Sequence, residues 1–277
     1  MDRLRFGTGG IPVSTPRKTT VNGIKRIREL GLDAMEIEFV RGVRMSESTA
    51  LEVRRVAEEL DVVLTAHAPY YINLCSDDRS KFEASVQRII DTVKIGWVAG
   101  VWSVVFHPGY YGKLSSEEAY RRVREGIAKV LEFVQSNGID LWIRPEVMGT
   151  HSEFGTLEEI VRLAAEFGPP VAPCIDFAHL HARSLGRYNT YEEFRSVLEY
   201  LEKELGKEIL SAMHIHVCGV EYGSKGEEKH VNLPETSFDY RTLMRVLKEF
   251  NVRGVVISES PDLEGDALRM KRAYEEA

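Results

Sequence analysis

Several apolar segments of this chain end on a side chain that can bind a metal ion. The run from Val171 to Ile175 is followed at once by Asp176, and His179 comes three residues later. A carboxylate and an imidazole at the end of a buried strand are ligands that zinc, manganese and iron accept. Other apolar runs end in the same way on His67, His107, Glu146 and Glu259, and one more carries His214 and His216 within it.

The full set of candidate metal ligands is His67, His107, Glu146, Asp176, His179, His214, Glu228, His230 and Glu259. A lone histidine at a strand end is more often a packed core or rim residue than a ligand, but so many imidazoles and acids together reverse that expectation. The set exceeds the needs of one four-coordinate ion, so we expect two or three metal ions. Clustered ions of this kind serve phosphoester hydrolysis, because they activate water and hold the phosphate oxygens.

Alternating strand and helix patterns run through the whole sequence and would position these side chains. The expected strands are Leu4–Gly7, Ala34–Val40, Val62–Ala66, Trp102–Phe106, Ile139–Ile143, Val171–Ile175, Ile209–Val217 and Gly254–Ile257. The expected helices are Thr20–Leu30, Ser46–Leu60, Asp77–Ala99, Ser115–Asn137, Leu157–Phe167, Tyr191–Leu205, Tyr240–Phe250 and Leu263–Ala277. Eight strand–helix units predict an α/β fold, the (β/α)8 TIM barrel, whose active sites form where the carboxyl ends of the strands meet. A doubly wound sheet is the competing interpretation.

Length and composition agree with a single TIM-barrel catalytic domain over residues 1–277. No apolar run approaches the length of a membrane span, so we expect no membrane association. The three cysteines form no spacing motif, which favours a reducing cytoplasm over a disulfide framework. The net charge of −7 gives no support for nucleic-acid binding, although bound divalent cations would reverse the sign locally. We expect a monomer.

Six motifs, in order along the chain, resemble the signatures of the endonuclease IV family. They are His67–Asn73, Phe106–Gly109, Cys174–His179, Met213-His214, Glu228–His230 and Ser258–Pro261. That family comprises zinc-dependent apurinic/apyrimidinic-site endonucleases built on xylose isomerase-like barrels. Each motif alone is weak, but the ordered set is specific and runs from about residue 60 to the C-terminus.

The resemblance implies a trinuclear site with up to three Zn2+ ions, with Mn2+ or Fe2+ as possible substitutes. One ion would be held by His67, His107 and Glu146. Glu146 would bridge to a second ion bound by Asp176, His214 and Glu259, and the third would be held by His179, Glu228 and His230. Glu146 and Glu259 would be the catalytic carboxylates.

This sequence departs from the family pattern at three places. Glu228 stands where the family usually has Asp, Glu146 is followed by Val-Met-Gly rather than Asn-Thr-Ala, and the first strand ends in Gly7–Gly10 without a histidine. These differences indicate a divergent branch.

The resemblance also implies contacts with double-stranded DNA that carries abasic sites. Tyr70 and Tyr71 lie in a loop that enters the minor groove in the family, where aromatic wedges can fill the gap left by an extruded nucleotide. Arg41 and Arg44 are expected on the mouth side, where they could contact phosphates. The alternative is that Tyr71 and its neighbour Ile72 only pack beneath the loop.

The remaining histidines and the long connection near the candidate ligands are expected to have supporting roles or none. His181 and His216 alternate with candidate ligands and could hold them in place from behind, whereas His151 is read as a loop residue without a role. The long connection from Val217 to Phe238 is rich in Gly, Lys and Glu. We expect it to lie over the mouth and to be mobile until a metal ion binds.

Three functions remain open on the sequence alone. The first is an endonuclease that cleaves the phosphodiester 5′ to abasic sites and leaves a 3′-hydroxyl and a 5′-deoxyribose phosphate. The second is a sugar isomerase or epimerase of the same barrel class, which needs one divalent ion on Glu146, Asp176, His214 and Glu259 and moves protons beside a carbonyl. The third is a DNA-binding protein without turnover, which has little use for so many ligands.

Overall fold

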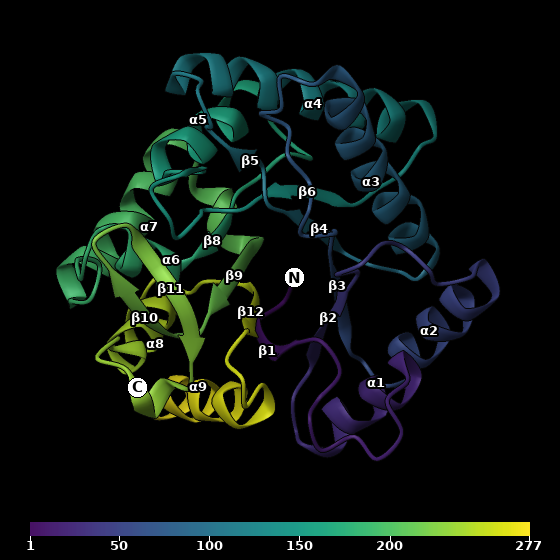
Figure 1. Cartoon of the computed structure of the whole chain (residues 1–277). Coiled ribbons are helices and arrows are strands. Elements are labelled where there is room, and N and C mark those ends of the chain that lie inside the picture. The colour runs from purple at the N-terminus through teal and green to yellow at the C-terminus, as the bar shows by residue number, and fades with distance from the viewer.

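A barrel of parallel strands surrounded by helices makes up the computed structural model, which describes residues 1–277 (Figure 1). The strands are β1 (Leu4–Gly9), β2 (Ala34–Glu38), β3 (Val63–His67), β4 (Ser103–Phe106), β5 (Gly109–Tyr110), β6 (Trp142–Pro145), β7 (Glu153–Phe154), β8 (Cys174–Asp176), β9 (Met213–Val217), β10 (Gly219–Gly223), β11 (Gly226–Val231) and β12 (Gly254–Ser258).

Eight of these strands are hydrogen-bonded in the order β6-β4-β3-β2-β1-β12-β9-β8, and every pairing is parallel. The two ends of this sheet meet, because Ile143 is bridged to Val171 and Glu146 to Cys174. The closed parallel sheet confirms the predicted TIM barrel. Its strands are apolar and buried on both faces, as parallel sheets require.

Helices form the outer ring around the strands (Figure 1). They are α1 (Thr20–Glu29), α2 (Glu47–Glu59), α3 (Arg79–Val98), α4 (Ser116–Ser136), α5 (Leu157–Phe167), α6 (Phe177–Arg183), α7 (Tyr191–Leu205), the 3₁₀ turns η1 (Lys207–Ser211) and η2 (Leu233–Glu235), α8 (Tyr240–Glu249) and α9 (Glu264–Glu276). Side-chain caps fix where several of them begin: Ser46 accepts the backbone N–H of Thr49, and Ser115 forms a capping box with Glu118.

The structure corrects the bounds of three strands that carry or lead into candidate ligands. β6 begins at Trp142 rather than Ile139 and extends to Pro145. β8 begins at Cys174 rather than Val171 and ends on Asp176, and the unpredicted helix α6 follows directly. The expected strand Ile209–Val217 begins instead with the 3₁₀ turn η1, and β9 starts only at Met213. The apolar residues Ile209 and Leu210 pack from a helical turn, since a short apolar run does not distinguish strand from helix.

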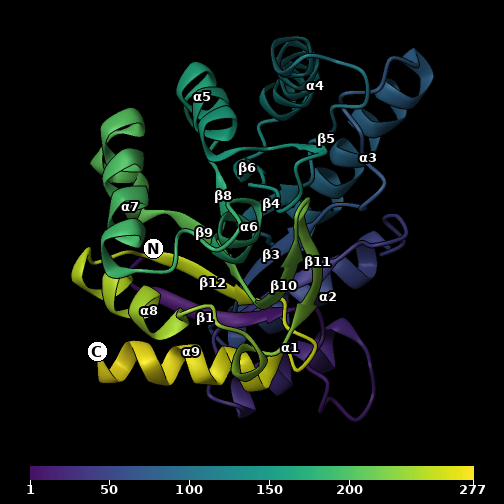
Figure 2. The same ribbon diagram turned by 60° about the vertical axis from the view of Figure 1, so that its left-hand side comes forward.

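The long connection after β9 is also more regular than expected. It forms the antiparallel hairpin β10–β11, which stands beside α6 (Figure 2). The hairpin is held to the segment after β6 by backbone hydrogen bonds from Glu227 to Gly149 O (3.1 Å) and from His151 to Lys225 O (3.0 Å). The connection expected as a loop over the mouth is therefore a hairpin that is hydrogen-bonded to the barrel mouth.

No helix combines the length and the apolar character that crossing a membrane requires.

Candidate metal centre at the barrel mouth

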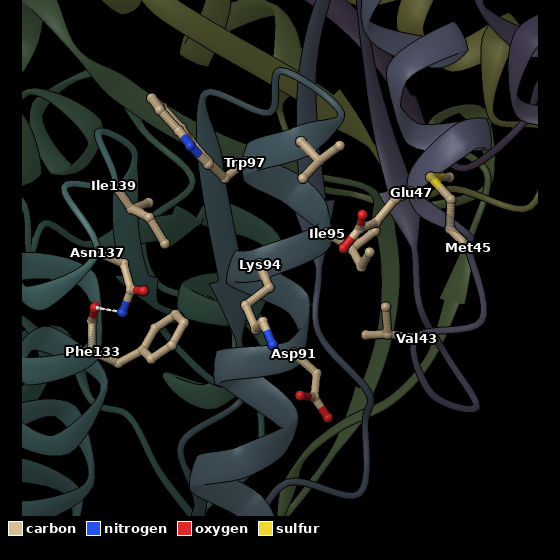
Figure 3. Close-up of a pocket in the computed structure, with 11 residues that line it drawn as sticks. Val43, Met45, Glu47, Asp91, Lys94, Ile95, Trp97, Phe133, Asn137 and Ile139 are labelled. Atoms are coloured by element: carbon tan, nitrogen blue, oxygen red, sulfur yellow. Dashed lines mark hydrogen bonds between the residues drawn. The ribbon is translucent and has the colours of Figure 1, made fainter.

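A hollow of about 590 Å³ opens at the carboxyl ends of the strands. Many of its lining residues are ionisable side chains: Glu38, Tyr70, His107, Glu153, His179, Glu227, Glu228, His230 and Glu259. A second hollow of about 490 Å³ lies outside the barrel over α3, between Phe133 and Ile139 on one side and Val43 and Met45 on the other (Figure 3). The outer hollow is mainly apolar and holds no histidine. The chemistry therefore belongs at the mouth.

The first ligand group joins two histidines from neighbouring strand ends to one carboxylate. His67 Nε2 lies 3.2 Å from Glu146 Oε2, and His107 Nε2 lies 3.3 Å from the same oxygen. Glu146 and His67 are fully buried, and no lysine or arginine pairs with the carboxylate. Burial lowers the pKa of His67, but the hydrogen bond with Glu146 and the negative charges of Glu38, Glu146 and Glu36 together raise that pKa to about 10.

The second group lies beside the first and shares Glu146 with it. Glu146, Asp176, His216 and Glu259 bring their ligand atoms within 4.8 Å of one another. One oxygen of Asp176 accepts the backbone N–H of His179 at 2.7 Å and so caps α6, while its other oxygen is buried without a hydrogen-bond partner. Burial raises the pKa of Asp176 to about 7, although His179 opposes the shift. A cation among these groups would satisfy the free oxygen.

His214 was expected in this second group, but His216 takes that place, and His214 is grouped with Cys174 and His216 as another potential metal-binding set. His214 and His216 both point into the barrel from β9, but Asp176 is paired with His216 while His214 is paired with Cys174, nearer the start of the strand. His214 therefore lies one layer below the mouth, where Ser103 Oγ is 3.0 Å from its Nδ1. Sequence alternation predicts the shared face but not the depth, and depth decides which histidine meets the acids.

The third group consists of His179, Glu227 and His230. The Glu227 carboxylate lies 3.1 Å from His179 Nε2 and 3.0 Å from His230 Nε2. Burial alone would lower the pKa of His230, but the hydrogen bond with Glu227 and the negative charges of Glu259 and Glu227 together raise it to about 9. His179 Nδ1 in turn lies 3.2 Å from Glu146 Oε1, so the third group also touches the shared carboxylate.

Glu227 takes the place expected for Glu228, because the hairpin contains a β-bulge. Glu221 is paired with Lys229 while the next residue, Tyr222, is paired with Glu227. The extra residue, Glu228, is left exposed. Strict alternation would put residues 228 and 230 on one face, but the bulge shifts the alternation by one residue and brings Glu227 beside His230 instead.

Gly149 makes this arrangement possible from the other side. A Cβ atom at Gly149 would lie 2.3 Å from Glu227 Oε2 and 3.0 Å from His179 Cδ2. Gly149 is the last residue of the Val-Met-Gly segment that follows Glu146. The absence of a methyl group at this position therefore leaves room for the Glu227 side chain.

The predicted DNA-contacting residues have different surroundings. Tyr71 is 51% exposed, with the Arg88 guanidinium 4.5 Å above its ring, whereas its neighbour Ile72 is buried. Tyr70 contacts a candidate metal ligand, because its ring stacks on that of His107 with the ring centroids 5.3 Å apart.

Tyr70 also donates a hydrogen bond to Glu38 Oε2 at 3.0 Å, and burial raises the pKa of the Tyr70 hydroxyl. Arg41 and Arg44 are exposed and line a separate hollow beside Glu38. Tyr70 is 42% exposed, but its ring and hydroxyl are both engaged by residues of the site.

Two acids of β2, Glu36 and Glu38, belong to the site although they were not among the predicted residues. Glu36 is fully buried, and Glu38 forms a group with Glu36 and Glu259. Burial, opposed by His67, raises the pKa of Glu38 to about 8. The sequence signal was present, since Ala-Met-Glu-Ile-Glu places two acids on one face of an otherwise apolar strand.

The other residues considered from the sequence serve the surrounding structure. His181 is buried against Tyr222 and Phe238, with its Nδ1 2.8 Å from Arg187 O, and does not touch the three groups. His151 Nε2 lies 2.7 Å from Arg183 O. His181 therefore does not hold a candidate ligand in place from behind.

The donor set fits divalent metal ions. Imidazole and carboxylate donors converge in three groups at the mouth, with a shared carboxylate and a partnerless buried oxygen at their centre. Two further groups adjoin them: Cys174 with His214 and His216, and Glu36 with Glu38 and Glu259. One ion could be held by His67, His107 and Glu146. A second could be held by Glu146, Asp176, His216 and Glu259, and a third by His179, Glu227 and His230.

Comparison with known proteins places this barrel among its relatives. The chain is 42% identical over 273 residues to the uncharacterized protein MJ0133 of Methanocaldococcus jannaschii, covering 99% of this chain and 97% of that one. It is 27% identical over 203 residues to a probable endonuclease 4 of Mycoplasma pneumoniae, covering 72% and 68% of the two chains.

Two solved structures share the fold. A D-tagatose 3-epimerase-like protein superimposes with a TM-score of 0.74 at 20% identity, covering 98% and 96% of the two chains. Endonuclease IV from Thermus thermophilus superimposes with a TM-score of 0.71 at 22% identity, covering 99% and 100%. The sequence also matches the family described as xylose isomerase-like TIM barrel over residues 24–276. This chain therefore belongs to the xylose isomerase-like TIM barrel family, as a divergent relative of the proteins named endonuclease 4.

Proposed function

We propose that this protein is a metal-dependent endonuclease that cleaves the DNA phosphodiester 5′ to an abasic site and leaves a 3′-hydroxyl and a 5′-deoxyribose phosphate. The observation that carries the proposal is the meeting of three ligand groups at Glu146, whose two oxygens lie 3.2–3.3 Å from His67, His107 and His179. An isomerase that uses one ion needs neither the first group nor the third. Endonuclease 4 relatives among the sequence matches support the same activity.

Zinc, with up to three ions per chain, is the proposed metal, because the groups combine histidine nitrogen with carboxylate oxygen. Such ions, when bound, supply Lewis acidity and lower the pKa of water. Glu146 is fully buried, so it would serve as a ligand to the bound ions rather than touch DNA. Glu259 lines the hollow, which suits it to accept a proton from the attacking water.

Double-stranded DNA with an abasic site is the proposed partner. Tyr71 and Arg88, stacked on each other beside the mouth, offer a flat exposed surface to a base or sugar. Arg41 and Arg44 are exposed and form no ion pair, so they are available to phosphates. The protein would act as a monomer in the cytoplasm.

A sugar epimerase is the second candidate, and one observation favours it. The central group alone could hold one divalent ion beside a hollow of about 590 Å³, a volume within the range of small-molecule sites. The histidines of the other two groups would then have no metal to bind. The number of bound ions separates the two functions.

The test combines metal content with two activity assays on the same preparation. Elemental analysis should find about three zinc ions per chain. A labelled duplex with one tetrahydrofuran abasic analogue should be nicked 5′ to the lesion, giving an end that a polymerase extends, while the undamaged duplex stays intact. Glu146→Gln should reduce nicking at least about 100-fold and keep the melting temperature of the metal-free protein.

A different set of results would instead identify an epimerase. One ion per chain, no nicking above the Glu146→Gln variant, and interconversion of ketohexose epimers would overturn the nuclease and establish the epimerase.

A further inference from the structure

A buried polar layer lies directly beneath the candidate metal centre, and Glu36 is its middle. Glu36 points from β2 into the barrel and is fully buried. Thr65 Oγ1 donates a hydrogen bond to its Oε2 at 2.6 Å, and no lysine or arginine pairs with it. An ionised carboxylate in such a place needs compensation, and its two nearest ring nitrogens are those of His214 and His216.

The two oxygens of Glu36 lie between these two histidines of β9. Oε1 is 2.9 Å from His216 Nε2, and Oε2 is 3.0 Å from His214 Nε2. Both ring nitrogens and Glu36 Oε1 are buried, and none of these three atoms makes a hydrogen bond of ordinary geometry. Glu36 is therefore the acceptor that a proton on either nitrogen would face.

The other nitrogen of His216 faces the metal centre. His216 Nδ1 lies 3.4 Å from Glu146 Oε1 and 3.4 Å from Glu259 Oε1. One edge of the ring thus meets the second ligand group and the other meets Glu36. A neutral imidazole can bind a cation only through the nitrogen that carries no proton, so the position of the single proton decides whether Nδ1 is a ligand.

We infer that Glu36 is a positioning residue for the central metal: it accepts the Nε2 proton of His216 and so keeps Nδ1 free to bind the ion. This inference rests on the metal centre of the proposed function. Carboxylates behind metal-bound histidines fix the tautomer, orient the ring and increase its basicity. Glu36 occupies that place in this chain.

The residues around Glu36 hold it in this orientation. Thr65 and His214 both engage Oε2, and Ser103 Oγ lies 3.0 Å from the remaining nitrogen of His214. Rotation of the carboxylate away from His216 would break these interactions. His214 belongs to this layer, and it also forms a potential metal-binding group with Cys174 and His216.

Glu36→Gln tests the inference, because it keeps the shape and removes the charge. An amide can donate its own N–H to His216 Nε2, which would move the ring proton to Nδ1 and block the metal. Titration of the metal-free protein with zinc against a chromophoric chelator should show one ion bound about 10–100-fold more weakly. Thr65→Val is the matched control, since it removes one hydrogen bond to the same carboxylate but leaves its charge, and it should change the affinity far less.

Nitrogen-15 NMR of the zinc-loaded wild type, labelled in its histidines, provides a readout that does not depend on folding of a variant. His216 should show zinc on Nδ1 and a proton on Nε2. Zinc on Nε2, or equal zinc affinities of Glu36→Gln and wild type, would overturn the inference. Both measurements use zinc alone, so a failure to nick abasic DNA would count against the nuclease without affecting the assignment of Glu36.

Discussion

The β-bulge in the β10–β11 hairpin makes a prediction that separates two adjacent glutamates. Glu227 lies between His179 and His230, at 3.1 Å and 3.0 Å, whereas Glu228 is exposed next to it. Glu227→Gln should therefore weaken binding of the third ion, and Glu228→Gln should not. The two variants remove the same charge from neighbouring positions, so each controls for the other.

The expected magnitude follows from the role of Glu227 as a direct ligand. Glu227 is the only carboxylate in its group. Burial alone would raise its pKa, but the charges of His179 and His230 hold that pKa below the ordinary value. Removing a partner behind a ligand typically costs 10–100-fold in metal affinity, so removing the ligand itself should cost at least about 100-fold, or about 2.8 kcal/mol. Gly149→Ala should also weaken binding of the third ion, since the added methyl group would displace the Glu227 carboxylate.

The assay is a zinc competition titration of the metal-free variants, followed by metal analysis after dilution and by nicking of abasic duplex. Wild type and Glu228→Gln should retain three ions, and Glu227→Gln should retain two and lose nicking. The hairpin itself should stay folded, because it is anchored by backbone hydrogen bonds to Gly149 and from His151. Loss of the third ion from Glu228→Gln, with full retention by Glu227→Gln, would refute the role assigned to the bulge.

Two further predictions concern substrate contact and pH. Tyr71→Ala should weaken abasic duplex binding by about 1–3 kcal/mol, as for a lost base stack, and leave zinc binding unchanged. Tyr70→Ala should weaken zinc binding as well, because the Tyr70 ring stacks on His107, a candidate ligand. A collapse of the melting temperature of Tyr71→Ala would instead indicate that Tyr71 packs in the fold. In the metal-free protein the pKa values of His67 and His230 are raised to about 10 and about 9, so both are protonated at pH 7. Zinc must displace these protons, so its apparent affinity should rise from pH 7 to 9. Calorimetry in buffers of different ionisation enthalpy should detect the released protons. Zinc binding without proton release would contradict the assignment of these histidines as ligands.

The sequence by itself determined the barrel and most of its mouth. Eight apolar segments alternating with amphipathic helices have few other ways to bury both faces of a parallel sheet. Once the barrel is inferred, residues at strand ends such as His67, His107 and Glu146 must converge, because the strands are parallel and close on themselves. Their placement needed no information beyond periodicity.

Tertiary structure alone decided the details that alternation cannot specify. Whether His214 or His216 meets the acids depends on the stagger between β8 and β9, which is a property of the paired strands and not of either sequence segment. Whether Glu227 or Glu228 turns inward depends on a bulge set by the hairpin register. Glu36 acquires its role only because the curved sheet brings β2 to face β9 across the interior, with β1 and β12 between them. Its histidine partners are therefore about 180 residues away along the chain.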